Sequence, residues 1–382
     1  MNRDIGILGW GRTAYDKKST TPLLTYFADA ARRALDSANV KMSDIDGLAI
    51  GSFQLHPDNA VTVAEQFGMS PRWAHQCTAG SGGPIAALLD AIRTIDAGKA
   101  EYVLILSGDA YDPQSLFDMM DKLTGSIRDY LTPHGFGGPN GLFALVTQKH
   151  MDRFGTTREQ LGRICIDQRI NAQGNDMALL QGELTMDDYL NARPIADPLR
   201  LFDCVLACSG AEAIVVGPLD RAPAGKGVRV IAGAERYNHP ADEIIPLEGG
   251  WATFRDALWA DAGYGPRDMD CIQLYDDYPI MVAIQLEDLG FCEKGSAGRF
   301  LDENRFTYDG TCPLNTGGGQ LSVGQAGMSG GLMLVTEAVQ QLRGEGGRRQ
   351  VEGARRALAS GFGMIGYGRG LAATAAVLEC AA

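Results

Sequence analysis

Short apolar runs alternate with stretches of helical periodicity along most of the chain. Residues 46–50 (DGLAI) and 102–106 (YVLIL) have the pattern of buried strands. Between them, residues 84–97 carry apolar side chains at helical spacing, opened by Gly and Pro and closed by Gly98. Strands that alternate with helices predict a sheet with helices packed on its faces.

The same rhythm returns later in the chain. It predicts a strand at 227–232, a helix at 252–262, a strand at 272–275 and a last strand at 372–378. Two such passes predict two similar halves, and the Pro-rich, charged stretch at 218–227 is typical of a linker between them. We therefore place one half at 1–222, with an inserted loop region at about 111–200, and the other at 223–382.

Composition narrows the class of protein. Of the 382 residues, 45% are hydrophobic and 21% charged, the balance of a compact globular chain. No apolar run approaches the roughly 20 residues of a membrane helix, and the start lacks the pattern of a signal peptide, so we expect a cytoplasmic protein that is not membrane-bound. The net charge of −13 argues against a nucleic-acid partner. Eight cysteines include no CxxC pair, so we expect no metal site.

Glycine-rich loops follow several of the expected strands. They lie at 80–83, 135–141, 317–331 and 361–370. Glycine lets the backbone approach a ligand closely or take positive φ. The run at 361–366 spells GxGxxG, but a final strand follows it instead of a βαβ unit, so we do not expect a dinucleotide site there.

Three long segments carry a family resemblance: RPIADPLRLFDC at 193–204, QLEDLGFCEKGSAGRF at 285–300 and LNTGGGQLSVGQAGMSGG at 314–331. They resemble the sterol-carrier-type branch of the thiolase superfamily, and the likeness runs from the first strand to the last. The resemblance implies the duplicated thiolase fold, five-layered α/β/α/β/α, and a homodimer. It also implies that a coenzyme A thioester binds where the loops of both halves meet, with coenzyme A as part of the substrate and no cofactor held by this chain.

Two positions that carry thiolase chemistry differ in this sequence. A thiolase of this branch has a nucleophilic cysteine at the start of its third helix, because a thiolate attacks thioesters readily. The resemblance puts Ser81 there, where it is also a good N-cap for the helix that Pro84 opens. Cys77 is an alternative nucleophile if the loop is rearranged. Where thiolases have Gly-His-Pro, this chain has Gln325, which cannot exchange a proton.

A third motif points to a different reaction. Tyr275-Asp276-Asp277-Tyr278 stands where sterol-carrier-type thiolases have His-Asp-Cys-Phe. A tyrosine first in this motif, followed by QLEDLGF, resembles the steroid side-chain-cleaving aldolases, as does PHG at 133–135. The resemblance makes Tyr275 the candidate catalytic tyrosine. The second catalytic tyrosine of those aldolases falls where Gln325 stands.

Retro-aldol cleavage needs a base for the β-hydroxyl proton, donors that hold the thioester enolate, and an acid. Tyr275 is the expected base if neighbours lower its pKa from about 10. We expect the Gln325 amide and the backbone at Gly317, Gly318, Gly319 and Gly366 to bind the substrate and stabilise the enolate. Tyr278, His134 and Tyr367 are further proton carriers. Several of these residues have a structural alternative. Tyr278 is also interpreted as an aromatic side chain packed in the core, and His134 as a side chain whose hydrogen bonds stabilise its loop. Asp276 and Asp277 are also interpreted as caps of the helix that begins near 279.

These residues and the resemblance are consistent with three functions. The first is a lyase that splits a β-hydroxyacyl-CoA, such as a steroid or other bulky side-chain intermediate, into a carbonyl compound and a shorter acyl-CoA. The second is a thiolase or acyltransferase that uses Cys77, and the third is a non-catalytic scaffold subunit. The aldolases that this chain resembles work with a small OB-fold, zinc-ribbon protein, so we expect such a partner here. The acyl chain itself is not predictable, since acyl pockets are lined by interchangeable apolar residues.

Overall fold

The computed structural model of the protein describes residues 4–55, 59–77, 79–112, 125–136, 138–240, 245–366 and 369–381. The strands of the main sheet are β1 (Ile5–Arg12), β2 (Gly47–Gly51), β3 (Trp73–Cys77), β4 (Val103–Asp109), β7 (Gly210–Pro218), β8 (Val228–Pro240), β9 (Cys271–Leu274), β10 (Arg356–Gly366) and β11 (Arg369–Cys380). The helices are α1 (Leu23–Ala38), α2 (Asn59–Gln66), α3 (Gly83–Asp96), α5 (Gly125–Tyr130), α6 (Pro139–Phe154), α7 (Arg158–Gln173), α8 (Met186–Leu190), α9 (Trp251–Ala262), α10 (Pro279–Asp288), α11 (Ala297–Glu303), α12 (Gly319–Val323) and α13 (Ser329–Leu342).

The strands pair in the order β3-β2-β4-β7-β1-β8-β11-β10-β9 and repeat one connectivity. On one side, β7 runs antiparallel to both β4 and β1, and on the other side β11 runs antiparallel to both β10 and β8. Leu314 forms a parallel bridge to Ile272 of β9, at the place that β3 takes beside β2. The division into halves at 222 stays a prediction, and this repetition supports it.

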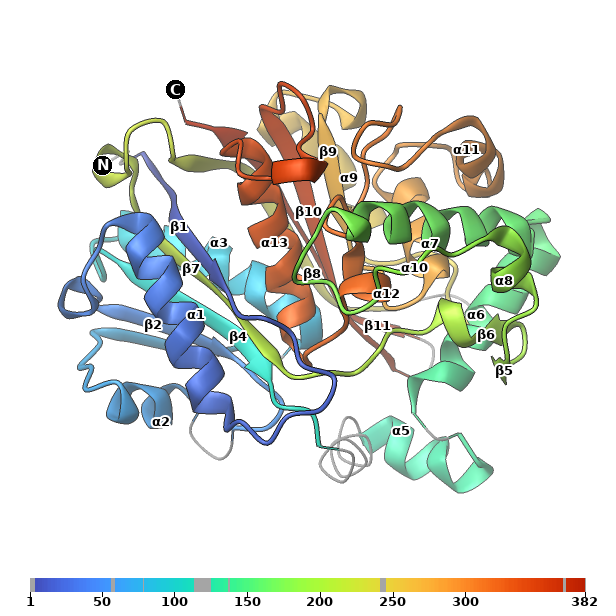
Figure 1. The fold of residues 1–382 in the computed structure, drawn as a ribbon, viewed down its shortest axis with the longest axis horizontal. Coiled ribbons are helices and arrows are strands. Elements are labelled where there is room, and N and C mark those ends of the chain that lie inside the picture. Colours follow the sequence, from blue (N-terminus) through green and yellow to red (C-terminus); the bar gives the residue numbers. More distant parts are fainter. Residues whose placement is uncertain are drawn as a thin grey trace.

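Helices fill three layers around the two groups of strands (Figure 1). On the outer faces, α1 packs on β1, β4 and β7, while α9 packs on β8 and β11. Between the two groups, α3 and α13 pack on each other and on strands from both halves. The fold-class prediction of a five-layered α/β/α/β/α arrangement is therefore confirmed.

The central helix α13 is buried along its whole length. Its polar side chains consequently need partners inside the protein. Glu337 on α13 pairs with Arg349 at 2.9 Å and lies 3.9 Å from Arg12 of β1. Arg12 also binds Glu212 of β7 at 2.6 Å. This buried charge network joins the middle layer to the sheet.

The inserted region covers the C-terminal half. Helices α6, α7 and α8 and the short strands β5 (Pro194–Ala196) and β6 (Leu199–Arg200) lie there, and α7 packs against α10, α11 and α12. A capping box starts α7, in which Thr157 accepts from the Gln160 N–H and Gln160 reaches back to the Thr157 N–H. Among the described residues, every helix falls short of the length and apolar character needed to span a membrane.

Candidate active site

Tyr275 follows directly on β9, at the end of that strand. The residue is only 3% exposed, and its ring packs beside that of Phe362 on β10, with 5.9 Å between centroids. Gln285 of α10 fixes the backbone, because its Oε1 accepts from the Tyr275 N–H at 3.2 Å and its Nε2 donates to the Tyr275 carbonyl at 2.7 Å. The tyrosine is thus held rigidly where the β9 strand meets α10.

The Tyr275 hydroxyl donates a hydrogen bond to Asp277 Oδ2 at 2.9 Å. Asp277 is 5% exposed, and its Oδ1 has no hydrogen-bond partner among the described residues. Burial, with the charge of Asp276 adding to it, raises the pKa of Asp277 well above its usual value. Burial and the neighbouring Asp277 likewise raise the pKa of Tyr275. The neighbours of Tyr275 therefore do not supply the lowered pKa that a free phenolate base would need, and the catalytic role of Tyr275 stays a prediction.

Asp276 has a different role from Asp277. Its carboxylate accepts from the backbone N–H groups of Gln320 at 3.0 Å and Leu321 at 3.3 Å, so it caps the start of α12. The N-cap of α10 is Tyr278, which makes no side-chain capping bond. The prediction that Asp276 and Asp277 cap that helix is wrong, because one caps α12 and the other binds Tyr275.

Ser81 lies in the short 3-10 helix that precedes α3. Its side chain interacts with the Tyr275 hydroxyl and favours the ionised form, which partly opposes the effect of burial on the pKa of Tyr275. The α3 N-cap is Gly82, without a side-chain capping bond, so the cap prediction for Ser81 is wrong. The Ser81 backbone is held tightly: a Cβ added at Gly331 of α13 would come 1.7 Å from the Ser81 carbonyl oxygen.

Cys77, the alternative nucleophile, ends β3 and is 4% exposed. Burial raises the pKa of its thiol to about 12. Thiolates, not thiols, attack thioesters, so Cys77 sits in surroundings that disfavour the reactive form. Its side chain packs against the start of α3, where a Cβ at Gly83 would lie 2.9 Å from the Cys77 Cβ.

Gln325 joins the same network from the loop between α12 and α13. Its Nε2 donates to Gln320 Oε1 at 3.1 Å, and Gln320 Nε2 donates to Asp276 Oδ1 at 3.3 Å. A Cβ at Gly330 would lie 2.1 Å from Gln320 Oε1 and 3.0 Å from Ser81 Oγ, so these two side chains are neighbours. Tyr275 and Ser81, predicted from distant segments, therefore meet, and Gln325 is linked to Ser81 through the side chain of Gln320.

The glycines at 317–319 are buried and packed against protein atoms. A Cβ would lie 2.7 Å from Glu337 Oε2 at Gly317, 2.6 Å from the Ala172 Cβ at Gly318 and 2.0 Å from Asp276 Oδ2 at Gly319. Internal packing thus accounts for glycine here, and the substrate-binding role stays a prediction. The Gly318 N–H is already bonded to the Asn315 carbonyl at 2.7 Å.

Tyr278 and His134 have surroundings different from those of Tyr275, Ser81 and Gln325. Tyr278 is buried, donates to Asn140 Oδ1 at 2.6 Å and stacks on Phe143 with 4.3 Å between centroids, as a packed aromatic does. His134 is exposed on a short 3-10 turn before α6. Gly366 closes the hairpin between β10 and β11, and Tyr367 lies outside the described residues.

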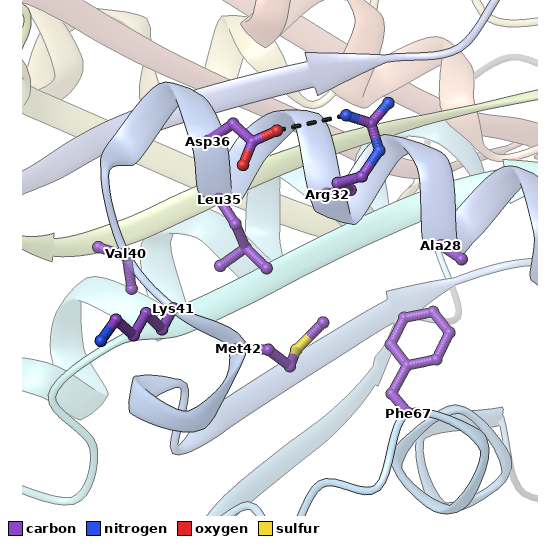
Figure 2. A pocket seen from close by; sticks show the side chains of 8 residues that line it. All are labelled: Ala28, Arg32, Leu35, Asp36, Val40, Lys41, Met42 and Phe67. Atoms are coloured by element: carbon purple, nitrogen blue, oxygen red, sulfur yellow. Dashed lines mark hydrogen bonds and ion pairs between the residues drawn. The ribbon is translucent and has the colours of Figure 1, made fainter.

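A surface pocket is lined by residues between Ala28 and Phe67. It is framed by α1 and the segment after it, with Phe67 opposite, and the Arg32–Asp36 ion pair crosses its rim (Figure 2). None of its lining residues belongs to the segments that carry Tyr275, Ser81 or Gln325. Among the described residues, no group of His, Cys, Asp or Glu is arranged to hold a metal ion.

Comparison with known proteins places the chain in a family. Residues 252–378 match the family model "Thiolase C-terminal domain-like". The 17-hydroxy-3-oxo-4-pregnene-20-carboxyl-CoA lyase of Mycobacterium tuberculosis is 31% identical over 371 residues, which cover 90% of this chain and 92% of the relative. The chain belongs to the thiolase superfamily.

Within this superfamily the chain has relatives of two kinds. An acetyl-CoA acetyltransferase of Methanothermobacter thermautotrophicus is 28% identical over 379 residues, covering 95% of this chain and 97% of that protein. A solved structure of the Ltp2-ChsH2(DUF35) aldolase superposes with a TM-score of 0.84 at 26% identity, covering 99% of this chain and 98% of that one. The predicted likeness of this superfamily member to the sterol-carrier-type thiolase-like aldolases is confirmed.

Proposed function

We propose that this chain is a carbon–carbon lyase that cleaves a β-hydroxyacyl-CoA by a retro-aldol reaction. The products are a ketone or aldehyde and a shorter acyl-CoA. The observation that carries the proposal is the buried Tyr275–Asp277 pair, with 2.9 Å between hydroxyl and carboxylate, in a site that has Ser81 and Gln325 at the thiolase nucleophile and base positions. The names of the aldolase and lyase relatives support the same reaction.

The chemistry of cleavage suits these side chains. A retro-aldol reaction removes the proton of the β-hydroxyl and breaks the Cα–Cβ bond, and no group attacks the thioester carbonyl. A thiolate is therefore unnecessary, whereas a proton-transfer group is required. Tyr275 is the proposed group that meets the substrate hydroxyl, because its own hydroxyl already has an acceptor in Asp277.

Donors for the enolate are proposed at the same place. Gln325 is half-buried, and its amide is the candidate side-chain donor. The N-termini of α3 and α13 both start beside Ser81, where the positive ends of helix dipoles favour developing negative charge. Each well-placed donor contributes about 3 kcal/mol to stabilising such a transition state. Coenzyme A enters only as part of the substrate.

The test is a direct assay of carbon–carbon cleavage. The chain, purified with its partner subunit, is incubated with a panel of β-hydroxyacyl-CoA thioesters that includes steroid side-chain thioesters. We expect the carbonyl product and the shorter acyl-CoA to appear in equal amounts. Formation of acyl-CoA only when free coenzyme A is added would instead indicate thiolysis.

Acyl transfer through Cys77 is the second candidate, favoured by the similarity to an acetyl-CoA acetyltransferase. The buried Cys77 thiol, with a pKa of about 12, weighs against it. Iodoacetamide separates the two reactions. Inactivation that acyl-CoA protects against would support Cys77 catalysis, and unchanged cleavage after treatment would support the lyase. If no acyl-CoA binds, the result would instead support a non-catalytic scaffold subunit.

We also propose the assembly and location. The superposed aldolase structure is a complex with a DUF35 protein, which supports a heteromeric complex with a small OB-fold, zinc-ribbon protein here. Purification of a fully active enzyme from this gene alone would contradict that proposal. The proposal further includes that the chain forms a homodimer and that the protein is cytoplasmic.

A further inference from the structure

We propose that Asp277 is the final proton acceptor of the cleavage, acting on the substrate hydroxyl through Tyr275. This inference rests on the proposed lyase function and deepens it. It assigns the Tyr275 hydroxyl a relay role, in place of a free phenolate that takes the proton by itself.

The hydrogen bond between Tyr275 and Asp277 already has the direction that a relay needs. The Tyr275 hydroxyl donates to Asp277 Oδ2, so its proton already points at the carboxylate and its lone pairs are left for another donor. Ser81 also interacts with that hydroxyl and favours negative charge on its oxygen. A substrate hydroxyl that donates to the Tyr275 oxygen would complete a chain that ends at Asp277.

The Asp277 carboxyl group is less fully bonded than that of its neighbour Asp276. Its Oδ1 is buried without a partner among the described residues, and a buried unpaired polar group costs about 1–3 kcal/mol. The neighbouring Asp276 provides the contrast, since both of its oxygens accept backbone N–H groups and cap α12. The backbone N–H groups of Asp277 and Tyr278 also favour the ionised form of Asp277, but the Tyr275 hydroxyl is the side-chain group bonded to it, as an acceptor for that proton requires.

The proton balance of the step is complete. The substrate β-hydroxyl gives its proton to the Tyr275 oxygen while the Tyr275 proton moves to Asp277 Oδ2. The Cβ–O bond becomes a carbonyl, and the electron pair of the broken Cα–Cβ bond forms the enolate of the shorter acyl-CoA. The proton then returns from Asp277 through Tyr275 to Cα, so Asp277 is again ionised at the end of the cycle.

Among the described residues, the titratable side chains that face Asp277 and influence its ionisation are Tyr275, Asp276, Tyr278 and Cys204. Burial raises the pKa of Asp277, with a further contribution from Asp276, so the carboxylate form is lost at a higher pH than for an ordinary aspartate. The acceptor must be ionised to take a proton. Turnover should therefore fall as pH decreases through this raised pKa, which gives an acid limb in the pH profile.

The opposite role makes the opposite prediction. A carboxylic acid kept neutral by burial can act as a hydrogen-bond donor to an oxyanion. In that case turnover would fall as pH rises, and an asparagine, which also donates, would replace Asp277 with little loss. The two roles thus differ in both the pH profile and the response to the amide.

The experiment measures kcat and KM against pH for the wild type, Asp277→Asn and Asp277→Glu, in complex with the partner subunit. We expect Asp277→Asn to lose about 10²–10⁴ in kcat with little change in KM, and to lose the acid limb. Asp277→Glu should recover part of the rate and keep an acid limb. Asp288→Asn, which alters another buried aspartate whose pKa is raised to about 7, is the matched control and should keep the wild-type limb.

Several outcomes would overturn the inference. They are an Asp277→Asn variant within a few-fold of the wild-type kcat, an acid limb that survives this substitution, or a wild-type profile that falls only toward high pH. Circular dichroism checks that each variant is folded. If Asp277→Asn does not fold, the wild-type and Asp277→Glu profiles still decide. A wild type that cleaves no β-hydroxyacyl-CoA would overturn the lyase proposal as well, whereas a fully active Asp277→Asn would overturn this inference alone.

Discussion

At the scale of single residues, substitutions of Tyr275 and Cys77 distinguish retro-aldol cleavage from acyl transfer. Tyr275→Phe removes the hydroxyl that binds Asp277 and should lower turnover by about 10²–10⁴, because loss of a proton-transfer group typically costs that much. Cys77→Ala removes a small buried side chain and should keep most of the turnover, at about 1 kcal/mol in stability. Cleavage of a β-hydroxyacyl-CoA by both variants is the measurement.

The reverse pattern would contradict the lyase. An inactive Cys77→Ala beside an active Tyr275→Phe would indicate an acyl-enzyme. Thermal unfolding of both variants serves as the control, since Phe keeps the ring contact with Phe362 and should leave the fold intact. A loss of turnover without a loss of folded protein is then a chemical effect.

Sequence reasoning reached Tyr275 and Gln325 only by resemblance, and it missed the partners that explain Tyr275. The position of Asp277 just before a helix predicts a helix cap, because aspartate is a common N-cap residue. Ser81 lies in the other half of the chain, and no local pattern signals that it meets Tyr275. Such contacts depend on how α3 and β9 are brought together, which no single segment encodes.

At the scale of elements, the close contact between α13 and Ser81 gives a test of site geometry. Gly331→Ala would place a Cβ 1.7 Å from the Ser81 carbonyl oxygen, so the backbone before α3 must shift. We expect a loss of about 1–3 kcal/mol in stability from overpacking, and at least a tenfold loss of turnover as Ser81 moves relative to Tyr275. Chemical denaturation and the cleavage assay measure the two effects.

Gly182→Ala is the matched control for that substitution. A Cβ at Gly182 has nothing within 4 Å, so stability should be unchanged or slightly higher, and turnover should stay the same. Equal behaviour of the two alanine variants would show that the contact between α13 and Ser81 has no effect on the site.

The buried carboxylate of α13 makes stability depend on pH. Burial alone would raise the pKa of Glu337, but the charges of Arg349 and Arg12 outweigh it and lower the pKa from 4.5 to about 2. The folded state therefore binds this proton less tightly than the unfolded state, and the stabilisation is complete above about 4.5 and is lost as pH falls toward 2. Glu337→Gln should cost about 3–5 kcal/mol at neutral pH, because it leaves the buried Arg349 without its carboxylate partner, while Arg12 keeps Glu212.

Urea unfolding of this variant across the acid range checks the sign. The difference from the wild type should shrink as pH falls from about 4.5 toward 2. Glu303→Gln, which breaks the exposed Arg299–Glu303 pair, is the control and should leave stability nearly unchanged across this pH range. A Glu337→Gln cost that does not vary with pH would contradict the assignment.

Elements were more predictable than their ends. The strands and the helix at 84–97 follow from hydrophobic periodicity, and the structure has β2, α3 and β4 close to the expected ranges. The caps were wrong for Ser81, Asp276 and Asp277, because the short 3-10 turn before α3 and the donors of α12 are features of the folded chain.

At the scale of the whole molecule, the exposed edge of the sheet supports the proposed homodimer. Among the residues that the structure describes, strand β3 pairs with β2 on one side and with no strand on the other, and its Ala74 and Gln76 are exposed. An unpaired edge strand is a site of pairing with another chain. Light scattering at micromolar concentration should give twice the 40.8 kDa of one chain, with β3 amides protected from hydrogen exchange. A 40.8 kDa species would contradict the dimer.

The overall plan was predictable in part for a physical reason. The hydrophobic pattern occurs twice along the chain and so predicts two similar halves, because each half would form its own strands and helices. It carries no information on the pairing of β1 with β8, which joins the halves into one sheet through the residue pairs at Gly6 and Ile7. Nor does it show that α3 and α13 are shared between both halves.

The shared middle layer also bears on how the chain folds while it is being made. The inner face of β1, β4 and β7 is covered partly by α13, which comes from near the end of the chain. During synthesis, those strands leave the ribosome long before residue 342 does. The apolar face of these strands therefore stays exposed until α13 has been synthesised, and exposed apolar surface in a nascent chain is prone to aggregation. Productive synthesis of this protein should thus depend on chaperones that hold the nascent N-terminal half until α13 emerges.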